Sequence, residues 1–264
     1  MAYDLPSDWD HFYLLNLADV HKGNIYLDKR LLLQYVDWVG GAENRLMTLG
    51  GDLLEAALKN SKGDVYDATM SPDKARKYMR QILEPVKNSI VGAVEGNHEY
   101  RIRKDTSIDC VEILSESLGV PYEREGMVFK FRLGKGRNGK KIAYSTYLTH
   151  GFGGGRTVAG KLKNLLSLSD IIFADSYLMG HVHVPLPGSK VYHVPDMQNN
   201  VVRKVPQVFA SSGAYLDYGG YAQKGGYAPN LMGSSALEFD GKNKYVRALT
   251  RGIHELKLDT KRGA

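Results

Sequence analysis

The segment SIVGAVEGNHE, residues 89–99, joins an apolar run to a polar signature that begins at Gly96. The run from Ser89 to Val94 has the length and composition of a buried strand. Directly after it come Asn97 and His98, whose side chains are of types that bind metal ions or transfer protons. The same design, a strand-like run followed by a polar signature, recurs along the chain and predicts both the fold and a site.

Four other strand-like runs end in short signatures rich in Asp and His. These runs cover residues 11–18, 45–50, 141–148 and 171–179, and their signatures are Asp19-Val20-His21, Gly51-Asp52, His150-Gly151 and Gly180-His181-Val182-His183. In mixed α/β folds, ligands gather where strands end, because the loops converge there on a rigid sheet. We therefore expect the five signatures to meet. We also expect each Asp-x-His or His-x-His triplet to be extended, so that both side chains leave the same face.

The polar residues of these signatures have the ligand types of a two-metal site. The candidate ligands are the carboxylates of Asp19 and Asp52, the imidazoles of His21, His150, His181 and His183, and the amide oxygen of Asn97. This mixed set suits borderline divalent ions. Asp52 follows two glycines that allow close backbone approach, and its carboxylate can bridge two ions. The expected chemistry is attack of a metal-bound hydroxide on a phosphate ester.

The rest of the pattern indicates an α/β chain with two stacked sheets flanked by helices. Helices are expected after the N-cap Asp28 up to Gly40-Gly41, and over residues 72–83, 107–118 and 157–168. A hairpin is expected from strands 127–133 and 141–148 around the turn 134–139, with further short strands at 191–194, 201–205, 208–211, 235–239 and 245–249. We expect one domain over residues 1–256 and a loose polar tail over 257–264.

Composition limits the class of protein. The 264 residues are 43% hydrophobic and 24% charged, which is typical of a soluble globular chain, and no apolar run approaches the ~20 residues of a membrane span. The segment from Met1 to Trp9 is too polar for a signal peptide, and Cys110 is the single cysteine, so no intrachain disulfide can form. We therefore expect a cytoplasmic protein. The net charge of +6 favours polyanionic partners, although single basic clusters are more often solvated surface.

As a set, the five signatures resemble those of the calcineurin-like metallophosphoesterase superfamily. The matching motifs are Asp19-x-His21-x-Gly23, Gly51-Asp52-x-x-Glu55, Gly96-Asn97-His98-Glu99, His150-Gly151 and Gly180-His181-x-His183, with Glu55 standing where the family often has Asp or Asn. The resemblance implies a four-layer αββα sandwich of two mixed sheets. It also implies one ion held by Asp19, His21, Asp52 and His183, and a second held by Asp52, Asn97, His150 and His181.

The resemblance further implies the cofactors and a catalytic residue. The family's metals are commonly manganese, iron or zinc, of which manganese is favoured here, and His98 takes the role of general acid or charge stabiliser. Arg101 and Arg156 are candidates for contact with a substrate phosphate, with a surface salt bridge as the alternative for each. The tyrosine-rich stretch 215–227 could stack on bases, although packing against the second sheet is the more common role of such residues.

These features together favour a metal-dependent phosphoesterase. A phosphodiesterase or nuclease is preferred, because the chain is basic and has a candidate stacking loop, and nucleic acid is then one partner class. The first alternative is a phosphomonoesterase acting on proteins or small molecules. The alternative from another class is a non-catalytic scaffold, since a retromer subunit shares this fold and has a degraded metal site. The sequence does not indicate the oligomeric state.

Overall fold

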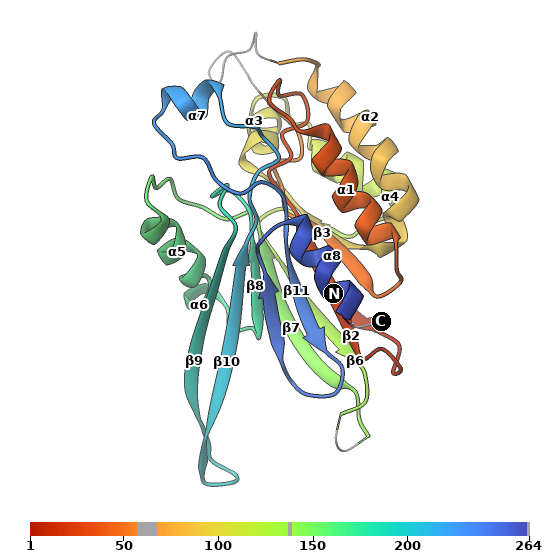
Figure 1. The fold of residues 1–264 in the computed structure, drawn as a ribbon, viewed down its shortest axis with the longest axis vertical. Coiled ribbons are helices and arrows are strands. Elements are labelled where there is room, and N and C mark those ends of the chain that lie inside the picture. The colour runs from red at the N-terminus through yellow and green to blue at the C-terminus, as the bar shows by residue number, and fades with distance from the viewer. Residues whose placement is uncertain (57–67, 137–138, 263–264) are drawn as a thin grey trace.

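Two six-stranded sheets pack face to face in the computed structural model, which describes residues 1–56, 68–136 and 139–262 (Figure 1). The strand orders are β12-β11-β2-β3-β4-β5 and β1-β6-β7-β8-β10-β9. The expected α/β sandwich of two mixed sheets flanked by helices is confirmed. Arg137 and Asn138 of the expected hairpin turn, and the last two residues of the expected tail, lie outside the described residues.

The first sheet has a parallel part that runs from β2 to β5. Its strands are β2 (His11–Leu17), β3 (Arg45–Leu49), β4 (Ile90–Val94), β5 (Tyr122–Glu123), β11 (Ser235–Asp240) and β12 (Val246–Leu249). β2, β3, β4 and β5 pair in parallel, whereas β11 pairs antiparallel with both β2 and β12. The carboxyl ends of the parallel strands therefore lie along one edge.

The second sheet also combines parallel and antiparallel pairs. Its strands are β1 (Ala2–Asp4), β6 (Met127–Leu133), β7 (Ile142–Thr149), β8 (Ser176–Met179), β9 (Leu186–Asp196) and β10 (Val201–Ser211). β7 and β10 flank β8 in parallel, and β6–β7 and β9–β10 are antiparallel hairpins. β9 and β10 are longer than expected and extend beyond the body of the molecule (Figure 1).

Helices cover the outer faces of both sheets. They are α1 (Lys29–Gly40), α2 (Pro72–Leu83), the 3-10 helix η2 (Glu84–Ser89), α3 (Asn97–Thr106), α4 (Cys110–Leu118), α5 (Val158–Leu166), α6 (Leu168–Ile171), α7 (Gly220–Lys224) and α8 (Ile253–Arg262). α1, α2, α4 and α8 pack on the first sheet, and α5 and α6 pack on the second (Figure 1). The expected cap of α1 is present, because the Asp28 side chain accepts a hydrogen bond from Leu31 N at 2.9 Å.

A layer of aromatic side chains joins the two sheets. Phe12 of β2 stacks on Phe239 of β11 with ring centroids 4.5 Å apart, and Phe131 of β6 packs against both rings from the opposite sheet. All three side chains are fully buried. Burial of this apolar surface is the main force that holds the sheets together, and it fixes the relative position of their strand ends.

Three sequence predictions differ from the structure. α3 was not expected, and the helix predicted from residue 107 begins at Cys110 after the N-cap Asp109. The strand predicted over 171–179 covers only Ser176–Met179. Ile171 and Phe173 are apolar, which suggested a buried strand, but their side chains are 59% and 55% exposed and lie outside the sheet. The segment expected to be a loose tail is helical as far as Arg262, and Leu256 of α8 is 1% exposed in the core beneath it.

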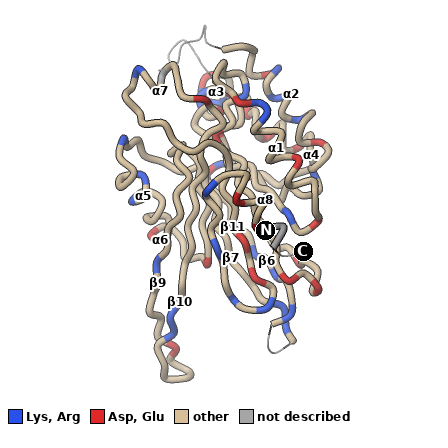
Figure 2. Tube along the Cα trace, viewed as in Figure 1, with Lys and Arg blue, Asp and Glu red and all other residues tan. Residues whose placement is uncertain are grey.

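Charges of both signs are interspersed over the surface (Figure 2). In the basic cluster of α2, both Arg76 and Lys77 pair with Asp73, at 2.7 and 2.8 Å. In α3, Arg103 pairs with Glu95 at 2.6 Å. The pairs of α2 agree with the solvated-surface interpretation of the clusters, whereas the pair of α3 anchors Arg103 to the buried Glu95. None of the helices in the described part of the chain has the length and apolar character of a membrane span.

Candidate metal centre

The carboxyl ends of β2, β3, β4, β7 and β8 meet at one edge of the sandwich. Each strand is followed within three residues by one of the five signatures. The structure brings the side chains of all seven predicted ligands into one cluster. The ligands lie up to 164 residues apart in the sequence, so the fold and not their spacing brings them together. The seven are Asp19, His21, Asp52, Asn97, His150, His181 and His183.

One half of the cluster contains Asp19, His21, Asp52 and His183, each with a ligand atom within 4.8 Å of the others. The Nε2 atoms of His21 and His183 lie 3.1 Å apart, and His183 Nε2 lies 3.2 Å from Asp19 Oδ1. Asp52 Oδ2 completes this half at 4.0 Å from His21 Nε2. Two imidazole nitrogens and two carboxylates thus face one point.

The other half contains Asp52, His150 and His181, again with ligand atoms within 4.8 Å of one another. Asp52 Oδ2 lies 3.3 Å from His150 Nε2. Asn97 Oδ1 lies 3.0 Å from that same nitrogen and 2.8 Å from His181 Nδ1. Asp52 belongs to both halves, which is the arrangement that a bridging carboxylate requires.

The chemistry of these atoms fits a cation. His150 Nδ1 lies 2.8 Å from the Gly50 carbonyl oxygen, to which only a protonated nitrogen can donate. In neutral His150 the lone pair is therefore on Nε2, which faces Asn97 Oδ1 and Asp52 Oδ2. With the Asn97 oxygen turned toward them, three acceptor atoms converge, and a positive ion would satisfy them together; in the opposite orientation the Asn97 NH₂ group can donate to Asp52 Oδ2 and to the two imidazoles. A carbonyl partner behind the imidazole is typical of metal ligands. These buried groups could hold metal ions.

Backbone contacts orient the two carboxylates. Asp52 Oδ1 accepts a hydrogen bond from His98 N at 2.8 Å, which leaves Oδ2 toward the cluster. Both oxygens of Asp19 accept from His181 N at 3.0 Å. The side chains of Asp19 and Asp52 are 0% and 2% exposed, so these contacts form in a site with little water. A carboxylate held in this way keeps its orientation whether or not an ion is bound.

The expectation of extended triplets is wrong. Left-handed backbone is found at Asp19 (φ 55°), His21 (φ 49°), Asp52 (φ 50°), His181 (φ 65°) and His183 (φ 53°). This conformation costs roughly 1–2 kcal/mol for each non-glycine residue. Sharp turns after the strands, rather than a continued strand, direct the side chains inward. Close packing enforces the turns: a Cβ on Gly96 would lie 2.0 Å from Asp52 N.

The buried charges perturb one another strongly. Burial raises the pKa of Asp52, but His150 and His98 outweigh burial and hold that pKa well below its usual value. Burial lowers the pKa of His150, but Asp52 outweighs it and raises the pKa to about 10. For His21, burial and the neighbouring His98 lower the pKa to about 3. Asp52 and His150 thus form an ion pair that a metal ion would replace with release of the proton.

His98 lies beside the cluster on the first turn of α3. Its Nδ1 is 3.0 Å from Glu55 Oε1, and its Nε2 is 4.0 Å from Asp52 Oδ2. Burial lowers the pKa of His98, but the contact with Glu55 and the charge of Asp52 outweigh it and raise the pKa. Glu55 also accepts from Asn24 Nδ2 at 2.9 Å, so it supports His98 from behind. The imidazole, 17% exposed, is partly open to solvent and protonated more readily than a free histidine.

The two predicted arginines lie in different surroundings. Arg101 lies at the edge of the cluster: its Nη2 is 3.2 Å from the end of the Asn97 amide that points away from the two imidazoles, and it donates a hydrogen bond there when that end is the amide oxygen. Arg156 is exposed, and its guanidinium lies 6.0 Å from the centroid of the Tyr227 ring. Neither makes a salt bridge within the described residues.

In the tyrosine-rich stretch, Tyr215 is fully buried against Tyr35, which agrees with packing, whereas Tyr218 is 48% exposed.

Sequence reasoning missed the role of Glu99. Its carboxylate accepts hydrogen bonds from the main-chain N–H groups of Asp52 and Leu54. A glutamate buried at the start of a polar helix was the available signal, but the helix itself was not predicted. Asp196 stabilises the turn after β9, since its Oδ1 accepts hydrogen bonds from Gln198 N and Asn199 N.

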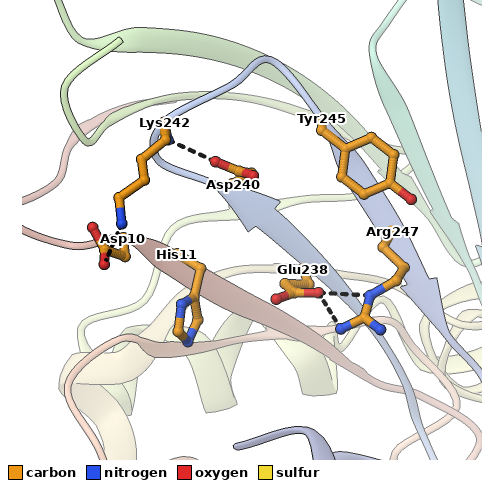
Figure 3. Close-up of a pocket in the computed structure, with 7 residues that line it drawn as sticks. All are labelled: Asp10, His11, Glu238, Asp240, Lys242, Tyr245 and Arg247. Atoms are coloured by element: carbon orange, nitrogen blue, oxygen red, sulfur yellow. Dashed lines mark hydrogen bonds and ion pairs between the residues drawn. The ribbon is translucent and has the colours of Figure 1, made fainter. Parts of the chain in front are cut away.

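A hollow of about 560 Å³ lies at the opposite end of β2 and is separate from the cluster (Figure 3). Asp10 and His11 border the hollow. Asp10 directly precedes β2 and His11 is its first residue, whereas Asp19 follows the other end of the same strand. The charged side chains of the hollow pair with one another: Lys242 contacts Asp10 at 2.7 Å, and Arg247 contacts Glu238 (Figure 3). These internal pairs leave the hollow without the convergent, unpaired donor atoms of the metal centre.

Comparison with solved structures finds metallophosphoesterases, a nuclease and Vps29 at low sequence identity. A metallophosphoesterase from Sphaerobacter thermophilus is 14% identical, with 96% of this chain and 94% of that chain covered and a TM-score of 0.40. The nuclease MPE of Pseudomonas putida is 13% identical, with 89% and 87% covered and a TM-score of 0.38. Vps29 of Entamoeba histolytica is 13% identical, with 90% and 97% covered and a TM-score of 0.40.

These structures include metallophosphoesterases, which is the class of protein that the motifs of this chain resemble. No family model matches the chain, and no curated protein matches it. At this level of identity, the geometry of the cluster carries the functional interpretation.

Proposed function

We propose that this protein is a dinuclear metal-dependent phosphodiesterase. The observation that supports this proposal is the pair of ligand groups that share Asp52. In the proposal, Asp19, His21, Asp52 and His183 hold one divalent ion, and Asp52, Asn97, His150 and His181 hold the other. Manganese, iron and zinc all suit this mixture of oxygen and nitrogen ligands, and manganese is our preference. Such ions would supply Lewis acidity at the phosphate and a hydroxide nucleophile at neutral pH.

The protein's own side chains would bind the substrate and move a proton. His98, partly open to solvent and with its pKa raised, would donate a proton to the leaving oxygen. Glu55 would hold the imidazole in place through Nδ1 and leave Nε2 to face the substrate. Arg101 reaches the edge of the cluster and has no salt-bridge partner among the residues that the structure describes, so its guanidinium would contact a phosphate oxygen.

The test is hydrolysis of bis-p-nitrophenyl phosphate by the purified protein with manganese. We expect turnover by the wild-type protein and a loss of at least about 100-fold in Asp52→Asn, because a neutral amide cannot bridge two cations as a carboxylate does. No turnover with manganese, iron or zinc would contradict the proposal and favour the non-catalytic scaffold. Equal or faster hydrolysis of p-nitrophenyl phosphate would favour a phosphomonoesterase instead.

Nucleic acid is our preferred substrate class within this proposal. The net charge of +6 would attract a polyanion, and exposed Tyr218 lies in the loop that could stack on bases. Binding of a single-stranded oligonucleotide should then weaken steeply between 50 and 200 mM salt through counterion release. Affinity that does not change over this range would exclude a nucleic-acid backbone as the main contact. The proposed location is the cytoplasm, to be checked by imaging a tagged chain.

A further inference from the structure

β9 has the longest free edge in the described part of the chain. It is the last strand of the second sheet and has 11 residues, whereas the other edge strands, β1, β5 and β12, have 3, 2 and 4. With β10 it forms the hairpin that projects beyond the body of the molecule (Figure 1). An edge strand carries a row of unpaired N–H and C=O groups, so it can pair with a further strand. The free edge of β9 is therefore a candidate interaction surface.

The pairing with β10 shows which groups of β9 face outward. In an antiparallel ladder, alternate pairs exchange hydrogen bonds and the pairs between them exchange none. Every proline of the hairpin falls in one class of pairs, and this must be the class without hydrogen bonds, because proline has no N–H. Ser189, Val191 and His193 belong to the same class, so their N–H and C=O groups point away from β10. The proline pairs are Pro187 with Ala210, Pro195 with Val202, and Pro206 with Val191.

Exposed apolar side chains gather on the hairpin. The described residues include nineteen exposed large hydrophobic side chains, and six of them lie on the hairpin or in contact with it. Phe173 packs edge-on against Tyr192 of β9 with ring centroids 5.9 Å apart. Apolar surface of this kind is typical of a contact with another protein. The six residues are Phe173, Val191, Val194, Met197, Val201 and Val202.

The charges of the hairpin favour a protein partner over a polyanion. Lys190 lies 3.8 Å from Asp170, and Arg203 pairs with Asp196 across the hairpin. Lys204 is the remaining lysine or arginine of the hairpin, and no carboxylate of the described residues pairs with it. One free cation beside six exposed apolar side chains is a poor match for a phosphate backbone, which proteins bind mainly through lysine and arginine.

We propose that β9 pairs with β9 of a second copy of this chain, antiparallel and about a two-fold axis at Val191. The second sheets of the two copies would then continue into one sheet. In this register Val191 lies opposite Val191, and Ser189 lies opposite His193 of the second copy, so the outward N–H and C=O groups of all three residues find partners. The free edge is thus complementary to itself, which is the condition for a two-fold interface between identical chains.

The prolines of β9 select this register. Pro187 and Pro195 would lie opposite each other at the two ends of the pairing, where neither is required to donate a hydrogen bond. A shift of the pairing by two residues would instead put a proline opposite Ser189 or His193, and the carbonyl of that residue would have no donor. The two prolines therefore limit the paired stretch to the residues between them.

The side chains along the edge suit the same register. Lys190 would lie opposite Tyr192 of the second copy, so that no two charges of one sign face each other directly. Gly188 would lie opposite Val194 and leaves room for it. Val191, which is 60% exposed, would be covered by its own copy on the axis. Burial of these apolar side chains adds to the hydrogen bonds of the paired edges.

The test is sedimentation of the full-length protein at concentrations from about 1 to 100 μM. We expect a concentration-dependent dimer for the wild-type protein and a dimerisation Kd at least about tenfold weaker in Val191→Lys, which puts two like charges opposite each other on the axis. Val202→Lys is the matched control, because Val202 is 63% exposed on the same face of the hairpin but lies on β10, which β9 separates from the second copy. This control should dimerise within about twofold of wild type.

Cross-linking tests the register itself. In Val191→Cys, oxidation by oxygen with copper phenanthroline should join two chains by a disulfide, because the Cα atoms of a hydrogen-bonded antiparallel pair lie about 5.5 Å apart. Val202→Cys should stay monomeric on the same non-reducing gel, and the native Cys110 is buried in both variants.

Two results would overturn the proposal, whatever the esterase activity of the protein. A wild-type protein that is monomeric at every concentration would leave the edge of β9 to a strand of another protein. Equal weakening by Val191→Lys and Val202→Lys, or equal cross-linking of the two cysteine variants, would mean that the copies meet through a face of the hairpin rather than through its edge.

Discussion

Glu99 holds the main chain of Asp52 in place. Its Oε2 accepts the N–H of Asp52 at 3.0 Å, and its Oε1 accepts the N–H of Leu54 at 2.8 Å. Asp52 is left-handed with φ 50°, so two hydrogen bonds from a fully buried carboxylate act on a strained part of the backbone. The residue proposed to bridge two ions is therefore positioned by a residue that faces neither group of ligands.

Glu99→Gln should lower both stability and turnover. A glutamine has one acceptor oxygen, so one of the two N–H groups would face an NH₂ group, and the unfolding free energy should fall by about 1–3 kcal/mol. Urea denaturation measures this change, and the kcat for bis-p-nitrophenyl phosphate should fall with it. Glu116→Gln, at an exposed position of α4, is the control and should stay close to wild type. Identical stability of Glu99→Gln and wild type would contradict the positioning role.

Removal of metal should abolish activity and lower the melting temperature. The ligand cluster contains two buried carboxylates, and ions that bind only the folded state stabilise it by mass action. The measurement is a thermal melt and an activity assay before chelation, after dialysis against EDTA, and after addition of Mn²⁺. Elemental analysis should find up to two transition-metal ions per chain in the active protein. Full activity in a sample shown to be free of metal would refute the two-metal site.

His98→Ala should reduce kcat by about 10²–10⁴-fold if the imidazole donates the proton to the leaving group. The loss should be larger for a dinucleotide than for bis-p-nitrophenyl phosphate, because p-nitrophenolate is a stable leaving group that needs less protonation. Steady-state kinetics on both substrates test this difference, with metal content measured in parallel. An equal loss on both substrates would argue that His98 stabilises charge rather than transfers a proton.

Leu256→Ala should destabilise the protein by about 2–5 kcal/mol, because truncation of a buried leucine leaves a cavity. Leu256 is 1% exposed within the core formed with α1, whereas Leu258 of the same helix is 61% exposed. Leu258→Ala is thus the matched control and should change stability by less than about 0.5 kcal/mol. Chemical denaturation compares the two variants. Equal midpoints would mean that α8 contributes nothing to the stability of the core.

Local sequence predicted those features that depend on neighbouring residues. The limits of α2 (Pro72–Leu83) and the cap at Asp28 follow from capping residues and apolar periodicity close by in the chain. α3 escaped prediction, since only Glu99 and Ile102 of its ten residues are buried and it shows no apolar face. Its N-cap Gly96 offers no side-chain cap either, so contacts with the Asp52 loop, rather than its own pattern, place this helix.

The sequence by itself determined which residue types follow each strand, and hence the proposal of a two-metal site in an α/β sandwich. The tertiary structure decided which atoms face one another: Asp52 Oδ2 rather than Oδ1, His150 Nε2 rather than Nδ1, and left-handed turns in place of extended triplets. The physical reason is that strand ends distant in sequence are fixed by the packing of the two sheets, and no local pattern encodes the contacts that form there.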